Sequence, residues 1–222
     1  FIEETARKYE VELFITAKGQ GIAHDWNFSL NKAKTKYVTL AHQDDLYHIA
    51  YSSSCFRASE KYKDTLICFT GYDEVIDDIK RTRTLLLRVK RLMLTSAMPF
   101  TNYIHNKIRK NLLLVAGCPI AAPSVMYNLE RLKDFQFSTE YSINMDWDAW
   151  CRLANMVGKF VYVKKALLTH RIHADSTTTA GLKANIRQDE DLKIFKRFWP
   201  DLLANQLAKI YARSYKSNIE KD

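Results

Sequence analysis

Short apolar runs alternate with stretches of helical periodicity along most of this chain, a pattern typical of α/β proteins. Residues 22–34 carry apolar positions three or four apart, and residues 36–41 read as a buried strand. A second helix and strand are expected at residues 50–63 and 65–70. Residues 11–15 are rich in β-formers and predict a strand ahead of the first helix. The order strand, helix, strand implies a parallel crossover, so we expect a mostly parallel sheet flanked by helices.

The α/β pattern continues in the second half of the chain. Residues 77–98 predict a basic amphipathic helix or helix pair, and residues 101–114 predict a further helix. Residues 117–126 are apolar, and two prolines in them favour an extended backbone of fixed shape. A helix with acidic residues in its first turn is expected at residues 146–154, and a strand at residues 160–163.

The C-terminal part differs from the rest because it is helical throughout. Residues 182–219 predict two helices separated at Pro200. With 222 residues, of which 47% are hydrophobic, the chain can bury a sizeable core. We therefore expect one α/β domain over residues 1–178 and a helical C-terminal extension over residues 179–222.

The formal net charge of +9 is compatible with nucleic acid, anionic lipid or a phosphorylated substrate as partner. Basic residues concentrate between Lys80 and Lys110, where either a solvated helix face or attraction to a membrane surface explains them. The sequence contains no zinc-finger spacing, RNP-like aromatic motif or recognition-helix signature, so we do not expect nucleic acid as partner.

No apolar run reaches the length of a membrane span, since the best candidate, residues 112–126, is interrupted by glycine and proline. The 4 cysteines are widely spaced and form no CxxC pair, which fits neither a zinc site nor a disulfide framework. A reducing compartment fits this cysteine usage best.

Two adjacent carboxylates, Asp44 and Asp45, directly follow the strand expected at residues 36–41. Ligands of parallel sheets bind outside the carboxyl ends of the strands, and oxygen ligands suit Mg²⁺ or Mn²⁺. The alternative is structural: Asp residues at such a position also cap a following helix. The spacing alone leaves both interpretations open.

The wider order of motifs favours the first interpretation. The motifs are the glycine loop Gly19-Gln20-Gly21, Asn27 in the next helix, the run Gln43-Asp44-Asp45, the segment Cys118-Pro119-Ile120, the helix start Asp146-Trp147-Asp148, and Arg171-Ile172-His173. In this order they resemble family 2 glycosyltransferases of the GT-A fold, over roughly residues 9–178. The resemblance implies an enzyme that transfers a sugar, with inversion, from a nucleotide-diphosphate donor to a glycan or lipid-linked saccharide acceptor.

The resemblance also implies roles for individual residues on the donor side. Asp44 would coordinate a divalent cation, Mn²⁺ or Mg²⁺, that neutralises the diphosphate leaving group. His42 stands where the family commonly has the first Asp of an Asp-x-Asp motif, and His173 belongs to the closing element, so both are candidate metal ligands. The expected donor-binding residues are Gly19, Gly21, Asn27, Gln43, Asp45 and Arg171.

On the acceptor side, an inverting transfer needs one carboxylate that accepts the proton of the attacking hydroxyl. Asp146 occupies that position by resemblance, and Asp148 is the fallback. We expect such an enzyme to act in polysaccharide biosynthesis in the cytoplasm, at the inner face of the membrane. The family's first nucleotide-binding strands have no counterpart before residue 9, so the competing hypothesis is a non-catalytic GT-A-like binding or assembly protein.

Overall fold

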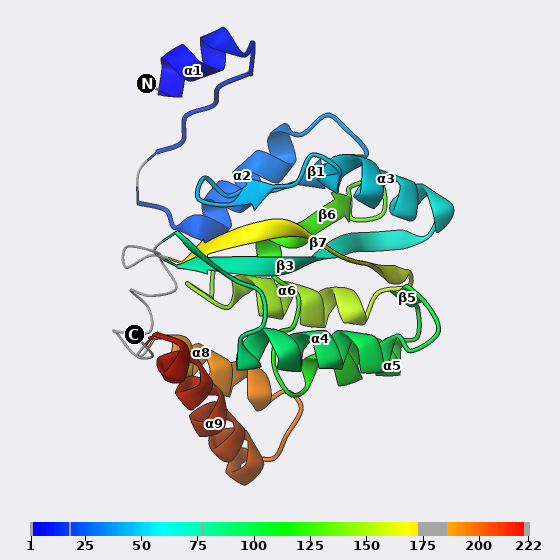
Figure 1. Ribbon diagram of the computed structural model, residues 1–222, viewed down its shortest axis with the longest axis vertical. Coiled ribbons are helices and arrows are strands. Elements are labelled where there is room, and N and C mark those ends of the chain that lie inside the picture. Colours follow the sequence, from blue (N-terminus) through cyan, green and yellow to red (C-terminus); the bar gives the residue numbers. More distant parts are fainter. Residues whose placement is uncertain (1, 18, 77, 173–185, 220–222) are drawn as a thin grey trace.

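The computed structural model describes residues 2–17, 19–76, 78–172 and 186–219, and shows one central sheet with helices on both faces (Figure 1). The five strands that form the sheet's main path are, from edge to edge, β1 (Tyr37–Thr39), β6 (Val125–Asn128), β3 (Thr65–Ile76), β7 (Lys159–Ile172) and β2 (Leu46–Tyr47). Two short strands lie off this path, with β4 (Ile79–Arg81) paired to β3 and β5 (Tyr103–Ile104) paired to β7.

The two longest strands, β3 and β7, are parallel neighbours. Strand β1 runs in the same direction, because it is antiparallel to β6 and β6 is antiparallel to β3. Strands β2, β4 and β5 are antiparallel to their neighbours. The expected α/β class is confirmed: most strand residues run in one direction, and short antiparallel strands complete a mixed sheet.

The strand predicted at residues 11–15 is wrong. This segment is extended and exposed, with Val11 and Ile15 showing 62% and 78% of their surface, and no described strand pairs with it. Branched and aromatic residues favour strands because they pack on a neighbouring sheet surface, and that surface is missing here. The parallel crossover between this segment and β1 is therefore also wrong.

Two predicted helices are shorter than expected because each is preceded by a short strand. Residues 77–98 contain β4 and then α4 (Leu85–Ala97), whose first turn is capped by the Thr84 side chain, which accepts from Leu87 N–H at 3.2 Å. Residues 101–114 contain β5 and then α5 (Lys107–Leu114). Strands β3 and β7 are longer than predicted, since their ends carry polar residues that hide the apolar pattern.

Helices cover the two faces of the sheet with different clusters of buried side chains. On one face, α3 (Tyr51–Lys61) packs Tyr51 and Cys55 against Cys68 of β3 and Val161 of β7. On the other face lies α6 (Met145–Ala154), whose hydrophobic residues belong to the largest core cluster. Strand side chains alternate between the faces, so one strand supplies both clusters.

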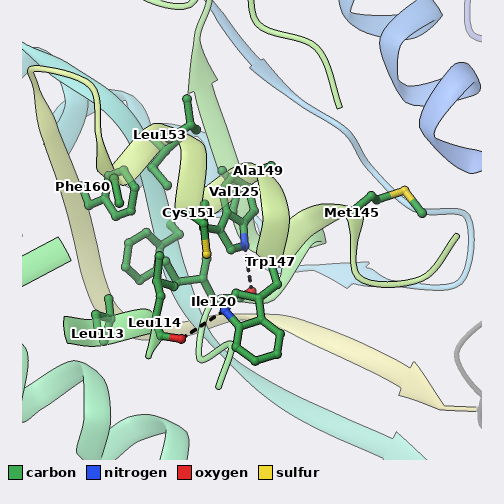
Figure 2. Packing of buried hydrophobic residues seen from close by; sticks show 14 of the residues in the cluster. Leu113, Leu114, Ile120, Val125, Met145, Trp147, Ala149, Cys151, Leu153 and Phe160 are labelled. Atoms are coloured by element: carbon green, nitrogen blue, oxygen red, sulfur yellow. Dashed lines mark hydrogen bonds between the residues drawn. The ribbon is translucent and has the colours of Figure 1, made fainter. Parts of the chain in front are cut away.

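The two tryptophans of α6 are buried in that largest cluster (Figure 2). The indole N–H of Trp147 donates to the Leu114 carbonyl at 3.2 Å (Figure 2). The indole N–H of Trp150 donates to the Ile120 carbonyl at 3.3 Å. Each buried indole thus keeps its one donor satisfied. These bonds hold α6 against the segment that leads through the 3₁₀ turn Ala122–Ser124 into β6.

The C-terminal region forms two helices, α8 (Ile186–Phe195) and α9 (Asp201–Ile219), that are separated at Pro200 as expected. Both pack into the main core, through Phe195 of α8 and Ala204 of α9 among others. Between them, Trp199 donates its indole N–H to the Val115 carbonyl at 2.8 Å. The helical C-terminal part is confirmed. At the other end of the chain, α1 (Ile2–Lys8) buries none of its residues.

Candidate functional site

The Asp44-Asp45 doublet lies in a turn between β1 and β2, and its two carboxylates have different surroundings. The Asp45 side chain is fully buried. Its Oδ1 lies 2.7 Å from Nδ1 of His170 and accepts the backbone N–H of Arg171 at 3.1 Å. Asp45 therefore fastens this turn to the carboxyl end of β7, while the half-buried Asp44 is the better candidate to face a ligand.

His42 belongs to the same turn and packs beside α2 (Ile22–Lys32). Its ring centre lies 5.1 Å from that of Trp26, and its Nδ1 lies 3.9 Å from Oδ2 of Asp45. Burial lowers the pKa of His42, against a smaller opposite effect of the Asp45 charge. The imidazole is therefore neutral at pH 7, which is the form that ligates metals.

The glycine loop leads directly into α2. Gly19 and Gly21 have φ angles of +88° and +86°, which other residues rarely adopt. Gly21 is the N-cap of α2, and no side chain caps that helix end. The first N–H groups of α2 are thus left for solvent or a ligand, in the setting where helices bind anionic groups.

Asn27 was expected to bind the donor, but its amide has two partners inside the protein. Its Nδ2 donates to the Phe137 carbonyl at 2.9 Å, and its Oδ1 accepts Phe137 N–H at 2.7 Å. The side chain pins the loop before α6 onto α2. These bonds give Asn27 a structural role, while its role in donor binding stays a prediction.

Asp146 lies in the first turn of α6, half-buried, with its Oδ1 accepting the N–H of Trp147 at 2.7 Å. Burial raises the pKa of Asp146 above its ordinary value, and the positive charges of Arg187 and Lys90 act in the opposite direction. A carboxylate whose pKa is raised toward neutrality is a better proton acceptor. The raised pKa is compatible with the predicted role of Asp146 as general base, and that role stays a prediction.

Asp148, the fallback base, faces two arginines. Its Oδ2 accepts Nε of Arg152 at 2.8 Å, and its Oδ1 lies 2.8 Å from a guanidinium nitrogen of Arg197. The carboxylate is buried and both oxygens are engaged, so it ties α6 to the segment after α8. These contacts favour Asp146 over Asp148 as the proton acceptor.

Three of the residues expected to bind the donor or a metal ion remain, namely Gln43, Arg171 and His173. Gln43 and Arg171 are exposed near Asp45, where they can meet a ligand. His173 lies outside the described residues. Within the part of the chain that the structure describes, no group of three or more His, Cys, Asp or Glu side chains is arranged to hold a metal ion.

Sequence analysis missed a polar cluster at the carboxyl end of β3. Asp73 is paired with Arg91 of α4 at 2.8 Å and with Lys80 of β4 at 3.1 Å. Beside it, Glu74 is buried, and burial raises its pKa. The available signal was that Asp73 and Glu74 follow the apolar run at residues 65–70, as Asp44 and Asp45 follow theirs.

A second missed residue is Glu190 of α8, which binds the loop before α6. Its two carboxylate oxygens accept the backbone N–H groups of Ser142, Ile143 and Asn144 at 2.6, 3.0 and 2.8 Å. This contact fixes the approach to Asp146. No sequence signal connects residues that are nearly fifty positions apart.

These features meet at one edge of the molecule. The carboxyl ends of β3 and β7 and the beginning of α6 lie on the same side in Figure 1, at its left, and the close-up of α6 agrees (Figure 2). The hydrogen bond between Asp45 and His170 places the Asp44-Asp45 turn at this edge as well.

The solved structures with a similar fold include three of one protein, although no protein-family model and no curated protein matches the chain. They are structures of the glycosyltransferase TarS from S. aureus: residues 1–349 (TM-score 0.56, 11% identity), the longer protein (0.55, 12%), and residues 1–349 in complex with UDP-GlcNAc (0.53, 11%). The chain has a GT-A-like fold.

The match covers 93% of this chain in each case, but 55%, 33% and 57% of the three TarS chains. The chain thus spans a third to somewhat more than half of the length of these three TarS chains. At this level of identity the likeness establishes the fold, and residue roles have to be argued from the geometry above.

Proposed function

We propose that this protein is a glycosyltransferase that uses a nucleotide-diphosphate sugar as donor and binds it at the carboxyl edge of the sheet. The observation that carries the proposal is the position of the Asp44-Asp45 turn, which Asp45 fastens to the end of β7. A GT-A-like fold shared with a protein that binds UDP-GlcNAc supports the same site.

The diphosphate has a suitable place beside α2. The uncapped N-terminus of that helix, reached through Gly19 and Gly21, offers backbone N–H groups and the positive end of the helix dipole. Arg171, exposed beside Asp45, supplies a fixed fork of donors for phosphate oxygens. Gln43 in the same turn is placed to orient the nucleotide.

A divalent cation, Mn²⁺ or Mg²⁺, fits this site in the mode where one carboxylate and the substrate phosphates share the ion. Asp44 would hold it, because Asp45 is buried and bonded to β7. His42, neutral through burial, would be the second ligand if the ion is Mn²⁺. The ion would supply charge neutralisation at the leaving diphosphate.

For the transfer itself, we propose an inverting reaction in which Asp146 accepts the proton of the acceptor hydroxyl. The acceptor oxygen attacks the anomeric carbon of the sugar from the face opposite the diphosphate. The raised pKa of Asp146 strengthens it as a proton acceptor. Glu190 contributes by holding the loop that leads to this carboxylate.

The acceptor class follows from the resemblance rather than from a contact. We propose a glycan or lipid-linked saccharide as acceptor, with the enzyme acting in the cytoplasm in polysaccharide biosynthesis. No helix among the described residues is long and apolar enough to cross a bilayer.

The proposal is tested by release of nucleoside diphosphate from a panel of nucleotide sugars, with Mn²⁺ or Mg²⁺ and a mixed saccharide acceptor. Asp44→Asn should abolish the metal-dependent activity, and Asp146→Asn should lower kcat by at least about 100-fold, since one positioned base contributes that much. Asp134→Asn, on an exposed turn, is the matched control and should act like the wild type.

Two results would contradict the proposed function. No release from any donor would reject enzymatic activity. Donor binding without release would favour a GT-A-like binding or assembly protein instead.

A further inference from the structure

Helices α4 and α5 pack against each other on the outside of the molecule, and α5 in turn packs on α6 (Figure 1). Their outward side carries large apolar residues that no other element among the described residues covers. These are Leu85, Val89 and Leu92 of α4, Phe100 in the connection, and Ile108 and Leu112 of α5. We call this surface the α4–α5 face.

The α4 side chains among these are highly exposed because their spacing along α4 places them on the side of the helix that faces away from the core. Leu85 and Leu92 of α4 are 77% and 67% exposed, whereas Leu87 and Leu94 on the opposite side of the helix are buried in the core. Phe100, in the connection between α4 and β5, is 97% exposed. An aromatic side chain in that position costs solubility unless something covers it.

The charged residues in the segment that forms this face have one sign. From residue 79 to residue 129 the sequence contains nine Lys and Arg residues and no Asp or Glu. Some of these cations are used internally: Arg91 pairs with Asp73, and Lys110 is buried under α5. Arg83, Arg88 and Lys107 are exposed beside the apolar residues.

We propose that the α4–α5 face is a docking surface for an anionic lipid bilayer. Exposed aliphatic and aromatic side chains insert at the boundary between headgroups and acyl chains, while the surrounding Lys and Arg bind lipid phosphates. Apolar residues together with basic residues favour a bilayer over nucleic acid, because aliphatic side chains bury no apolar surface against a phosphate backbone. This proposal goes beyond glycosyl transfer and does not depend on it.

The surface geometry also favours a membrane over a protein partner. The exposed residues stand on two adjacent helices and on the connection that follows α4. A protein partner that matched this face would need both a broad apolar surface and acidic groups at several positions. An anionic bilayer supplies both along its whole surface.

Vesicle co-sedimentation of the full chain tests the proposal. Wild-type protein should bind vesicles of phosphatidylcholine with phosphatidylglycerol, bind vesicles of phosphatidylcholine alone at least about tenfold more weakly, and lose affinity as salt rises above about 0.1 M. The apolar variant Leu92→Ser/Phe100→Ser and the charge variant Arg88→Gln/Lys107→Gln should each lower the affinity by about tenfold or more.

The matched control is Leu202→Ser on α9, since Leu202 is 73% exposed but lies outside the α4–α5 face. It should leave vesicle binding unchanged. All variants replace exposed residues, so their unfolding midpoints should stay at the wild-type value. Equal binding to both vesicle types, an equal loss in the control, or salt-sensitive binding to RNA without binding to vesicles would each overturn the proposal.

Discussion

At the scale of single residues, adjacent identical side chains have different roles. Asp44 and Asp45 are indistinguishable in the sequence, yet Asp45 is buried against β7 and Asp44 is half-buried. Similarly, Asp146 and Asp148 share the first turn of α6, but Asp148 forms ion pairs with Arg152 and Arg197. The sequence singled out these four carboxylates as candidates, but it could not assign their contacts, which for Asp45 are with residues more than a hundred positions away.

The Asp45 side chain should therefore affect folding more than Asp44 does. Asp45→Ala removes a buried acceptor for His170 and for Arg171 N–H, and should lower the free energy of unfolding by about 2–4 kcal/mol. Asp44→Ala should cost less because its carboxylate is more exposed. Urea unfolding of both variants measures the difference, and an equal loss would contradict the anchoring role of Asp45.

Substitutions at two glycines distinguish the cost of an unfavourable φ angle from the cost of a steric clash. Gly158, between α6 and β7, has φ +139°, and an added Cβ would lie 2.7 Å from the Asp64 carbonyl oxygen. Gly19 also has a positive φ, but an added Cβ would meet nothing within 4 Å. Gly158→Ala should destabilise the protein by about 3 kcal/mol or more, and Gly19→Ala by about 1 kcal/mol. Thermal unfolding of the two variants measures which loses more stability. A larger loss for Gly19→Ala would contradict the steric clash expected at Gly158.

At the scale of elements, periodicity predicted the buried helices and strands and failed at their ends. Strands β3 and β7 continue into polar residues, because β3 pairs with β7 and β4 there. Residues 11–15 have strand composition but lack a partner strand among those described. Whether a segment forms a strand depends on a partner strand as well as on its own residues. The local sequence pattern does not show whether such a partner is present.

The contact of α8 with the loop before α6 should position the proposed base. Glu190→Gln keeps the size of the side chain but removes the charge that binds three backbone N–H groups, so the loop should loosen. We expect kcat to fall by about tenfold with KM for the donor nearly unchanged, because the donor side is built elsewhere. Steady-state kinetics measures this split, and a rise in donor KM alone would contradict it.

Lys110 of α5 gives stability an unusual dependence on pH. Its ammonium is buried and donates to the carbonyls of Met156 and Gly158 at 2.7 and 3.0 Å, and burial lowers its pKa from 10.5 to about 8. Between pH 8 and pH 10.5 the unfolded chain binds more protons than the folded one, so stability rises with pH.

A Lys110→Met variant should lack this rise. The difference in unfolding free energy between wild type and variant should shift in favour of wild type by up to about 3 kcal/mol across the window. Other lysines and tyrosines titrate in the same range, but their effect is common to both proteins. Denaturant unfolding at pH 8 and at pH 10.5 measures the shift, and parallel curves would show that Lys110 keeps an ordinary pKa.

At the scale of the whole molecule, the α/β class and the helical C-terminal part were predictable, because both rest on long periodic stretches. The integration of α8 and α9 into the main core was not, since it depends on single contacts such as Trp199 with Val115. The order of motifs predicts a ligand edge, and that edge stays a prediction.

The pH dependence of the reaction is a property of the whole molecule, because the pKa of Asp146 in α6 depends on its burial and on the charges of Lys90 in α4 and Arg187 in α8. The proposed base must be deprotonated, so kcat/KM should fall on the acid side through the pKa of Asp146, which burial raises above that of an ordinary Asp. Lys90→Met removes a positive charge that opposes this rise and should move the acid limb to higher pH. A limb at the ordinary Asp value, unmoved in the variant, would exclude Asp146 as the base.

The central claim is that one edge of the sheet binds the diphosphate of a nucleotide sugar together with a divalent cation. Paramagnetic broadening of backbone amide signals by Mn²⁺ with UDP tests it without requiring turnover. The account predicts broadening at Gly21, Asp44 and Arg171, sparing α9, and its loss in Asp44→Asn. Broadening centred elsewhere, or none at this edge, would contradict it.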